Sequence, residues 1–284
     1  MHAKIADYMN LVVPEYIPST LLSFFIGLIF SSALIGIIGF KLLLAMISIV
    51  FVTMGYNTYN AVYDMEIDKI NKPYRPLPNG SFTEKDALVI SLLLFTVATT
   101  SGFLINLNFG FIILIAIILA ILYSHPIFYF RRVFVINTLI GTTIYAVLFP
   151  LAGWAFLSIG RLPLPIILIL FFFGFGSAVL KDFEDLDGDR KHAINTIPKV
   201  MGQKSALRLI IACLLLSFVL LITLIALGFF TLDYAVLGIF VFLGIANARL
   251  LLNKHSKRVS RKIFLTGMLV LVLLELSIIV INLI

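Results

Sequence analysis

Most of the acidic side chains in this sequence lie in two short segments. Eight of the 14 Asp and Glu residues fall within residues 64–68 and 182–189. In the first segment, two aspartates and a preceding asparagine are spaced by four and four residues: Asn60, Asp64 and Asp68. In the second, three aspartates follow the spacing i, i+3, i+7: Asp182, Asp185 and Asp189. Either spacing places three side chains on one face of an α-helix, so each segment presents a stripe of oxygen ligands.

The ligand chemistry of these stripes favours magnesium. Mg²⁺ prefers oxygen ligands, keeps several waters and commonly shares its coordination shell with substrate phosphates. Basic residues follow each stripe, at Arg75 and at Arg190 and Lys191. Carboxylates can bind a metal, and the neighbouring basic side chains can bind an anion. This combination fits a diphosphate bridged by Mg²⁺. The alternative for either segment alone is a solvated acidic loop.

The two segments are similar enough to be diverged copies of one unit. In the first segment, Asp64 and Asp68 are four residues apart, and Pro76 follows eight residues after Asp68. In the second, Asp185 and Asp189 are also four residues apart, and Pro198 follows nine residues after Asp189. We expect a pseudo-repeat of four helices with a ninth helix appended, and a site at the interface of the two repeats.

The composition is that of an all-α, polytopic membrane protein. Of 284 residues, 61% are hydrophobic and 12% are charged, and the mean hydropathy is +1.13, whereas soluble domains are about half apolar and about one quarter charged. One span needs about 20 apolar residues, so nine spans use nearly the whole chain. We therefore expect a single transmembrane domain over residues 1–284, without a separate soluble module. The predicted spans are 14–36, 40–63, 84–105, 109–130, 133–157, 163–183, 205–228, 231–252 and 262–284.

The basic residues predict the orientation in the membrane. In a nine-span topology, 19 of the 21 Lys and Arg residues lie on the side of the N-terminus and the even-numbered loops, and only Lys41 and Arg161 lie on the other. The positive-inside rule then places the N-terminus and both aspartate segments in the cytoplasm. We expect a multi-pass protein of the cell membrane whose site faces the cytoplasm. The net charge of +7 thus indicates cytoplasmic loops, and we expect no nucleic-acid partner.

Two motifs in the sequence resemble those of the UbiA-type intramembrane prenyltransferases. The stretch NAVYDMEIDKINKPYRP, residues 60–76, is similar to the family's N-x3-D-x3-D signature with its trailing Asn, Pro, Arg and Pro. The stretch KDFEDLDGDRKHAINTIP, residues 181–198, is similar to the second aspartate motif with its Gly-Asp and Thr-x-Pro tail. Ala61 departs from the pattern, because many members carry Asp there, but the three spaced ligands do not depend on it. The amino-acid sequences of both motifs most resemble those of one branch of the family, the archaeal digeranylgeranylglyceryl phosphate synthases.

The resemblance implies nine helices around a central cavity that opens to lipid, with two Mg²⁺ ions. We expect no obligate protein partner. In that branch a geranylgeranyl group passes from geranylgeranyl diphosphate to the free hydroxyl of geranylgeranylglyceryl phosphate, a lipid-phosphate acceptor. The implied metal ligands are Asn60, Asp64 and Asp68 for one ion and Asp182, Asp185 and Asp189 for the other. The implied catalytic residues are Asp64, Asp68, Asp185 and Asp189. The side chains implied to bind substrate are Arg75, Tyr123, Ser124, Arg131, Lys181 and Lys191.

Two alternative functions are consistent with parts of the pattern. The first is a prenyltransferase with an aromatic, quinone-precursor or chlorin acceptor. The second is an ion transporter or Mg²⁺ channel, which the sequence disfavours because the acids cluster at one face and do not follow a path through the bilayer. A general base is not evident: His125 is the best-placed histidine, but His2, His192 and His255 form no ligand pair with it or with one another. We expect no zinc or haem site.

Overall fold

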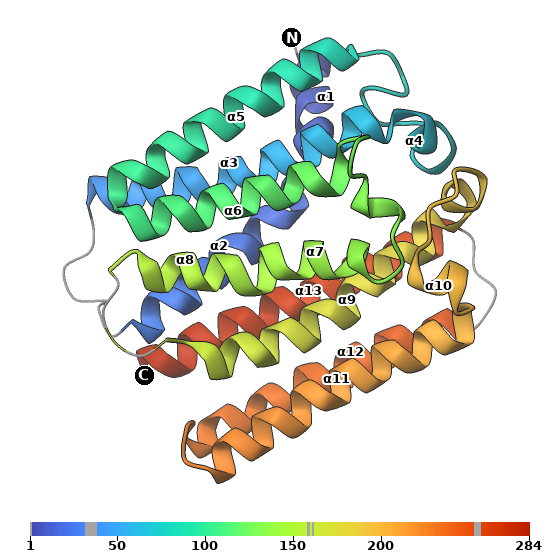
Figure 1. Cartoon of the computed structure of the whole chain (residues 1–284). Helices are drawn as coiled ribbons and strands as arrows, with labels where there is room; N and C mark the ends of the chain where they lie inside the picture. The colour runs from blue at the N-terminus through green and yellow to red at the C-terminus, as the bar shows by residue number, and fades with distance from the viewer. Residues whose placement is uncertain (1, 32–38, 158–159, 161, 253–256) are drawn as a thin grey trace.

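The computed structural model describes residues 2–31, 39–157, 160, 162–252 and 257–284, and the regular secondary structure of these residues is helical (Figure 1). Arg161 and His255 lie outside the described residues. The first helices are α1 (His2–Val12), α2 (Ile17–Phe30), α3 (Phe40–Tyr63), α4 (Met65–Asn71), α5 (Glu84–Ile105) and α6 (Leu107–Ser124). The middle of the chain forms α7 (Ile136–Thr143), α8 (Phe149–Ala155), α9 (Leu164–Lys191) and α10 (Ile197–Val200). The last helices are α11 (Gln203–Ala226), α12 (Gly238–Arg249) and α13 (Lys257–Leu283).

Eight of the described helices or helix runs are long and apolar enough to cross a membrane, and a bent pair makes a ninth. The bent pair joins residues Ile5–Val12 to Pro14–Phe30 at an angle of 53°. Its break lies at Val13, which has a positive φ of 52° and precedes a proline, a position where the α conformation is disfavoured. These spans confirm the predicted all-α polytopic architecture, and they fall close to the predicted ranges.

Two spans differ from regular α-helices in ways that affect the interior of the bundle. The span Ile136–Ala155 consists of α7, a π-helical turn at Ile144–Leu148, and α8. Pro150 at the start of α8 has no N–H to donate to the carbonyl four residues earlier, and such a gap in the ladder favours a π turn. The helix α9 continues through Lys191, eight residues beyond the predicted end of its span.

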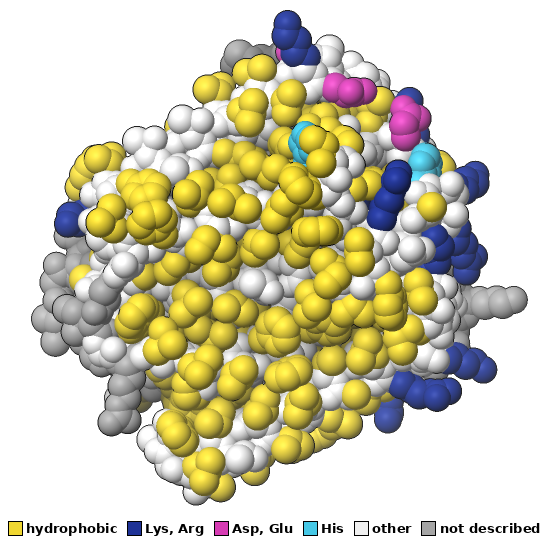
Figure 2. Space-filling view, in the orientation of Figure 1, with side chains coloured by type: hydrophobic (Ala, Val, Ile, Leu, Met, Phe, Trp, Pro, Cys, Tyr) yellow, Lys and Arg dark blue, Asp and Glu magenta, His cyan; other side chains and the backbone are white. Residues whose placement is uncertain are grey.

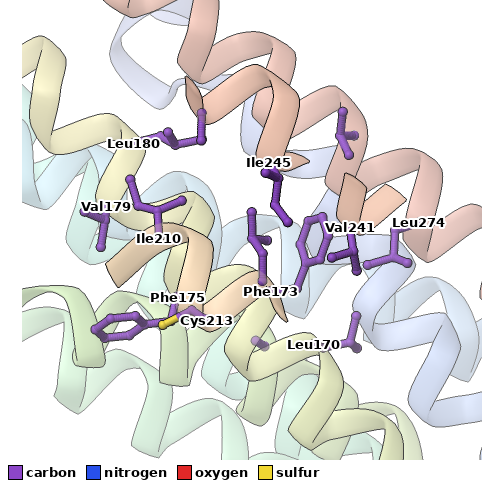
Figure 3. Close-up of a cluster of buried hydrophobic side chains, with 14 of the residues drawn as sticks. Leu170, Phe173, Phe175, Val179, Leu180, Ile210, Cys213, Val241, Ile245 and Leu274 are labelled. Atoms are coloured by element: carbon purple, nitrogen blue, oxygen red, sulfur yellow. The ribbon is translucent and has the colours of Figure 1, made fainter. Parts of the chain in front are cut away.

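The cores of the two halves of the bundle are apolar and separate. One core gathers side chains of α9, α11, α12 and α13, drawn in Figure 3: they include Phe173, Ile210, Val241 and Leu274. The other gathers side chains of α2, α3, α6 and α8: they include Phe24, Ile49, Phe109 and Phe149. Gly153 lets α8 approach α2 at backbone contact, because a Cβ there would overlap the backbone of Phe24.

The outer surface has the pattern expected of a protein surrounded by lipid. In Figure 2 hydrophobic side chains cover the middle of the visible face, while Lys and Arg gather toward the end of the bundle where α4 and α10 lie in Figure 1. We call this end the motif end, because both aspartate motifs, residues 60–76 and 181–198, lie there. The apolar band fits the hydrocarbon core of a bilayer, and the basic side chains fit its polar margin.

Candidate active site where the two aspartate motifs meet

The first motif keeps its three ligand residues on one face although the helix breaks within it. α3 ends at Tyr63 and α4 begins at Met65. Backbone hydrogen bonds nevertheless continue across the break: the N–H of Asp64 donates to the carbonyl of Asn60 at 3.0 Å, and that of Asp68 donates to Asp64 at 2.8 Å. The side chains of Asn60, Asp64 and Asp68 therefore follow one another along the same side.

The second motif lies on the last turns of α9 and is fixed to the first motif by Asn71. The amide nitrogen of Asn71 donates to the carbonyl of Asp185 at 2.9 Å, and its amide oxygen accepts from the N–H of Gly188 at 2.9 Å. A Cβ at Gly188 would lie 2.4 Å from the amide nitrogen of Asn71. The absence of a side chain at position 188 therefore makes room for the Asn71 amide against the backbone of α9.

Three basic side chains neutralise the buried carboxylates of the two motifs. Arg131 contacts Asp64 and also lies 3.8 Å from Asp189, so one guanidinium joins the first motif to the second. The ammonium of Lys72 lies 2.6 Å from Asp185.

The third pair lies within the first motif. The guanidinium of Arg75 lies 2.7 Å from Asp68. All of these carboxylates are buried, so each is held in a low-dielectric environment by a specific cation.

Two of the three basic residues of the first motif, Lys72 and Arg75, are strongly held in their charged forms. Burial alone lowers the pKa of the Lys72 ammonium, but the carboxylate of Asp185, with a smaller contribution from Asp68, outweighs burial and raises that pKa above its ordinary value. For Arg75, burial is likewise outweighed by Asp68, and the pKa of its guanidinium is raised. Both groups therefore remain cations at neutral pH and can bind an anion.

Several carboxylate oxygens at the motif end are buried and have no hydrogen-bond partner in the part of the chain that the structure describes. They are Asp64 Oδ1, Asp182 Oδ2 and both side-chain oxygens of Asp189. Among the described residues, no three His, Cys, Asp or Glu side chains lie close enough together to hold a metal ion. The donor set is nevertheless all oxygen, buried and partly unpartnered, and such a set fits Mg²⁺.

The end of α6 contributes polar side chains to the same region. Ser124 accepts a hydrogen bond from the amide of Asn60 at 3.3 Å, and Arg131 donates to the amide oxygen of Asn60 at 3.5 Å. Tyr123 packs edge-on against Tyr56, with ring centroids 5.6 Å apart. The predicted substrate-binding residues of this helix and the loop after it thus lie beside the first motif.

The two lysines of the second motif lie in different environments. Lys181 lines the central cavity, and its ammonium lies 5.9 Å from the ring centroid of Tyr16. Lys191 is exposed at the end of α9 and is not among the residues that line the cavity. His125 packs its ring 5.6 Å from that of Tyr63, and its Nδ1 accepts a hydrogen bond from the backbone N–H of Ile127 at 3.3 Å.

A cavity extends from the motifs into the bundle. Residues of α2, α3, α6, α7, α9 and α13 line it, with Asn60, Lys181 and Asp182 at the motif end. Tyr145, placed on the π-helical turn, stacks on Tyr16 with ring centroids 5.8 Å apart. The cavity therefore joins a charged, oxygen-rich mouth to a wall with large aromatic surfaces.

Sequence reasoning did not assign roles to three residues that the structure brings to the site or cavity. Lys72 and Asn71 each connect the two motifs, and both are part of the N-K-P stretch of the first motif. Glu275 lines the cavity from α13, and as the single acid within the apolar stretch of the last span it could have been singled out. Asn71 and Lys72 were missed because pairing across 114 and 113 residues of chain leaves no periodic signal.

Comparisons with known proteins identify the family of this chain. The pattern that defines the UbiA prenyltransferase family matches residues 20–274. A digeranylgeranylglyceryl phosphate synthase of Methanosphaera stadtmanae is 32% identical over 73% of this chain and 76% of its own length. A protein of the same name from Methanococcus maripaludis is 32% identical over 82% of this chain and 83% of its own length.

Solved structures give the same result for the fold. One, from work on digeranylgeranylglyceryl phosphate synthase in membranes, has a TM-score of 0.69 and 27% identity and covers 98% of both chains. A UbiA homolog from Archaeoglobus fulgidus bound to GPP and Mg²⁺ has a TM-score of 0.70 and 19% identity, covers 96% of this chain and 99% of that chain, and is similar in fold. This chain is therefore a multi-pass membrane protein that belongs to the UbiA prenyltransferase family.

Proposed function

We propose that this prenyltransferase moves a geranylgeranyl group from geranylgeranyl diphosphate to the free hydroxyl of geranylgeranylglyceryl phosphate and releases diphosphate. The proposal is supported by the relatives named digeranylgeranylglyceryl phosphate synthase, which match about three quarters or more of the chain. The main supporting observation is that the two buried aspartate motifs lie together at the mouth of one cavity, and that both motifs have carboxylate oxygens without a hydrogen-bond partner among the described residues.

The ligands of Mg²⁺ are proposed to come from both motifs. Asn60, Asp64 and Asp68 would hold one ion, and the second-motif aspartates would hold the other: Asp182, Asp185 and Asp189. Mg²⁺ held there would stabilise the negative charge that develops on the departing diphosphate. The unpartnered oxygens of Asp64, Asp182 and Asp189 support this assignment.

The basic residues of the site are proposed to bind the diphosphate of the donor. Arg75 and Arg131 present guanidinium groups beside the motifs, and a guanidinium binds phosphate oxygens in a planar, bidentate manner. Lys181 lines the cavity mouth and adds a further cation, and Tyr123 and Ser124 position the donor from α6. Lys191 is proposed only for an outer contact with the anion, because its side chain is exposed.

The chemical step exchanges one carbon–oxygen bond for another. The bond between C1 of the geranylgeranyl group and the diphosphate oxygen breaks, and its electron pair leaves with the diphosphate. The acceptor hydroxyl oxygen forms the new bond to C1, and its proton passes to the departing diphosphate. The aromatic walls of the cavity, including Tyr56 and Tyr145, exclude water that would otherwise capture the allylic cation.

The site is proposed to face the cytoplasm of the cell that makes the protein. Lys and Arg gather toward the motif end on the visible face (Figure 2), and the positive-inside rule assigns such an end to the cytoplasm. A water-soluble diphosphate product would then be released on that side.

The experiment that tests this function is a panel of acceptors with radiolabelled geranylgeranyl diphosphate, with and without a chelator. We expect labelled product with geranylgeranylglyceryl phosphate, release of diphosphate, loss of both with chelator and recovery with added Mg²⁺. Product formed only with an aromatic, quinone-precursor or chlorin acceptor would overturn the choice of acceptor. Ion flux in vesicles without diphosphate release would overturn the transferase assignment.

A further inference from the structure

An uncharged hydrogen-bond donor lies in the cavity wall at the start of α7. Asn137 is 5% exposed and lines the cavity. Its amide oxygen accepts from the backbone N–H of Thr138 at 2.7 Å and from the Thr138 hydroxyl at 3.1 Å. A backbone N–H can only donate, so the amide atom that faces it must be the oxygen. The orientation of the Asn137 amide is therefore fixed, with its NH₂ group directed away from that N–H.

The amide nitrogen of Asn137 has no hydrogen-bond partner within the described residues. It is also not among the unpartnered side-chain atoms that are closed off from solvent, so it is open to the cavity that the residue lines. The other asparagines of the cavity wall already donate: Asn57 to the carbonyl of Thr53 at 2.9 Å and Asn60 to the hydroxyl of Ser124 at 3.3 Å. An accessible, unpaired donor in a buried wall is a group that a ligand can satisfy.

Asn137 lies near the level of Lys181, at the mouth of the cavity. The consecutive spans of α7 and α9 run in opposite directions side by side (Figure 1), and a Cβ on Gly174 would lie 3.9 Å from Thr142. Asn137 is five residues before Thr142, about 7.5 Å along α7, and Lys181 is about 10.5 Å from Gly174 in the same direction along α9. The two side chains are thus within about one helical turn of the same level. Space is open beside Asn137, because a Cβ on Gly141, one turn further on the same face, would meet nothing within 4 Å among the described residues outside its own helix.

We propose that the amide nitrogen of Asn137 donates a hydrogen bond to the free hydroxyl oxygen of the acceptor and holds that oxygen beside C1 of the donor. The proposal rests on the proposed function, in which the donor diphosphate binds at the motif end. C1 is bonded to that diphosphate, so it lies at the cavity mouth, at the level of Asn137. The acceptor hydroxyl must reach the same place to attack.

The chemistry of the site favours the hydroxyl over the anions as the partner of Asn137. The diphosphate is matched by the cations Arg75, Arg131 and Lys181, whereas an uncharged amide suits an uncharged oxygen. A hydroxyl oxygen has two lone pairs: one accepts the N–H of Asn137 and the other attacks C1, while the hydroxyl proton passes to the departing diphosphate. The amide takes no proton, so Asn137 positions the nucleophile and is not a general base.

The test compares the acceptor with a deoxy analogue, in which hydrogen replaces the free hydroxyl. The affinity of each is measured in the presence of Mg²⁺ and geranylgeranyl thiolodiphosphate, a donor analogue that does not react. We expect the wild type to bind the deoxy analogue roughly 2- to 13-fold more weakly than the acceptor, as one uncharged hydrogen bond predicts. In Asn137→Ala this ratio of affinities should fall to about 1. Asn137→Leu, which preserves the side-chain volume, should give the same result and serves if the Ala variant does not fold.

The matched control is Asn57→Ala, which removes an amide of the same cavity whose nitrogen is already paired. Its ratio should stay within about twofold of the wild-type ratio. Equal affinities of the wild type for the two ligands would overturn the proposal. An undiminished ratio in a folded Asn137 variant would overturn it too, because a purely structural role would weaken the binding of both ligands together.

Two further measurements separate the hydroxyl from the anions. Asn137→Ala should bind the donor analogue alone within about twofold of wild type; a larger loss would place the contact on the diphosphate and overturn the proposal. It should still weaken the binding of an acceptor that lacks the phosphate, and the absence of that effect would place the contact on the phosphate and overturn it as well. Failure of the proposed function differs from these outcomes, because the wild type would then form no product with the acceptor.

Discussion

Substitution of Gly188 by alanine tests whether the junction between the two motifs depends on the close approach of Asn71. The new Cβ would lie 2.4 Å from the amide nitrogen, 2.7 Å from Cγ and 2.8 Å from the amide oxygen of Asn71. The Asn71 side chain is short, so it must rotate away from α9. Rotation removes both of its hydrogen bonds to the α9 backbone, to Asp185 and from Gly188, each 2.9 Å long.

The expected loss of stability follows from these two bonds. A typical hydrogen bond contributes a net of about 0.5–1.5 kcal/mol, and a buried group left unpaired costs about 1–3 kcal/mol. Alanine offsets up to about 1 kcal/mol of this loss, because glycine is the weaker helix former by that amount. Two groups left unpaired cost about 2–6 kcal/mol together, so after the alanine offset we expect Gly188→Ala to destabilise the protein by about 1–5 kcal/mol. We also expect it to lower turnover, because the Lys72–Asp185 pair lies at the same junction.

The assay is thermal unfolding of purified protein in detergent, combined with turnover. Gly174→Ala is the matched control on the same helix, because a Cβ there meets its nearest neighbour at 3.5 Å, an ordinary contact. It should be neutral or stabilising. A double-mutant cycle with Asn71→Ala sharpens the test: once the amide is absent, Gly188→Ala should cost nothing. Equal stability of the Gly188→Ala and Gly174→Ala variants would refute the reasoning.

The remaining predictions concern the charged groups of the site. Asp64→Asn and Asp185→Asn should each lower kcat by about 10²–10³-fold, as loss of one electrostatic participant does in other enzymes. Both variants should still purify as folded proteins. Normal turnover in either variant would contradict the metal assignment. Lys181→Ala should raise the KM for the donor several-fold and Lys191→Ala should not, since only Lys181 lines the cavity; the reverse order would disprove the placement. Inorganic diphosphate should tighten the binding of Mg²⁺ to the protein, measured by calorimetry, and Arg131→Gln should weaken this coupling between the two ligands. If Mg²⁺ and diphosphate bind to the wild-type protein independently, the predicted coupling is wrong.

The architecture could be predicted from the sequence because membrane spans leave a strong local signal. The spans follow from runs of about 20 apolar residues, and eight described spans with a bent ninth bear this out. The bend at Val13 follows from a local rule, since Pro14 disfavours helix at the residue before it. The π-helical turn that places Tyr145 in the cavity wall depends on Pro150 within a span. Hydropathy identifies the span but does not indicate such a turn inside it.

The site could be predicted only in part. The spacing of aspartates predicts two stripes, because i, i+4 geometry is local to one helix. The partners of those aspartates are non-local: Lys72 meets Asp185 across 113 residues, and Arg131 meets both Asp64 and Asp189 from a separate loop. Pairings of this kind depend on how helices pack, and a single sequence carries no periodic signature of them.

The basic side chains within the motifs give a physical reason for metal and diphosphate to bind together. A buried carboxylate without a counter-charge is costly, and Arg131 and Lys72 supply that charge to Asp64 and Asp185. A divalent cation that takes over these carboxylates would leave the guanidinium and the ammonium buried and unpaired. A diphosphate oxygen is the group that can pair with them, so the anion removes a penalty that the metal creates. Because such coupling is reciprocal, the donor would bind weakly without the metal, and the paired cations would keep the motifs joined until both arrive.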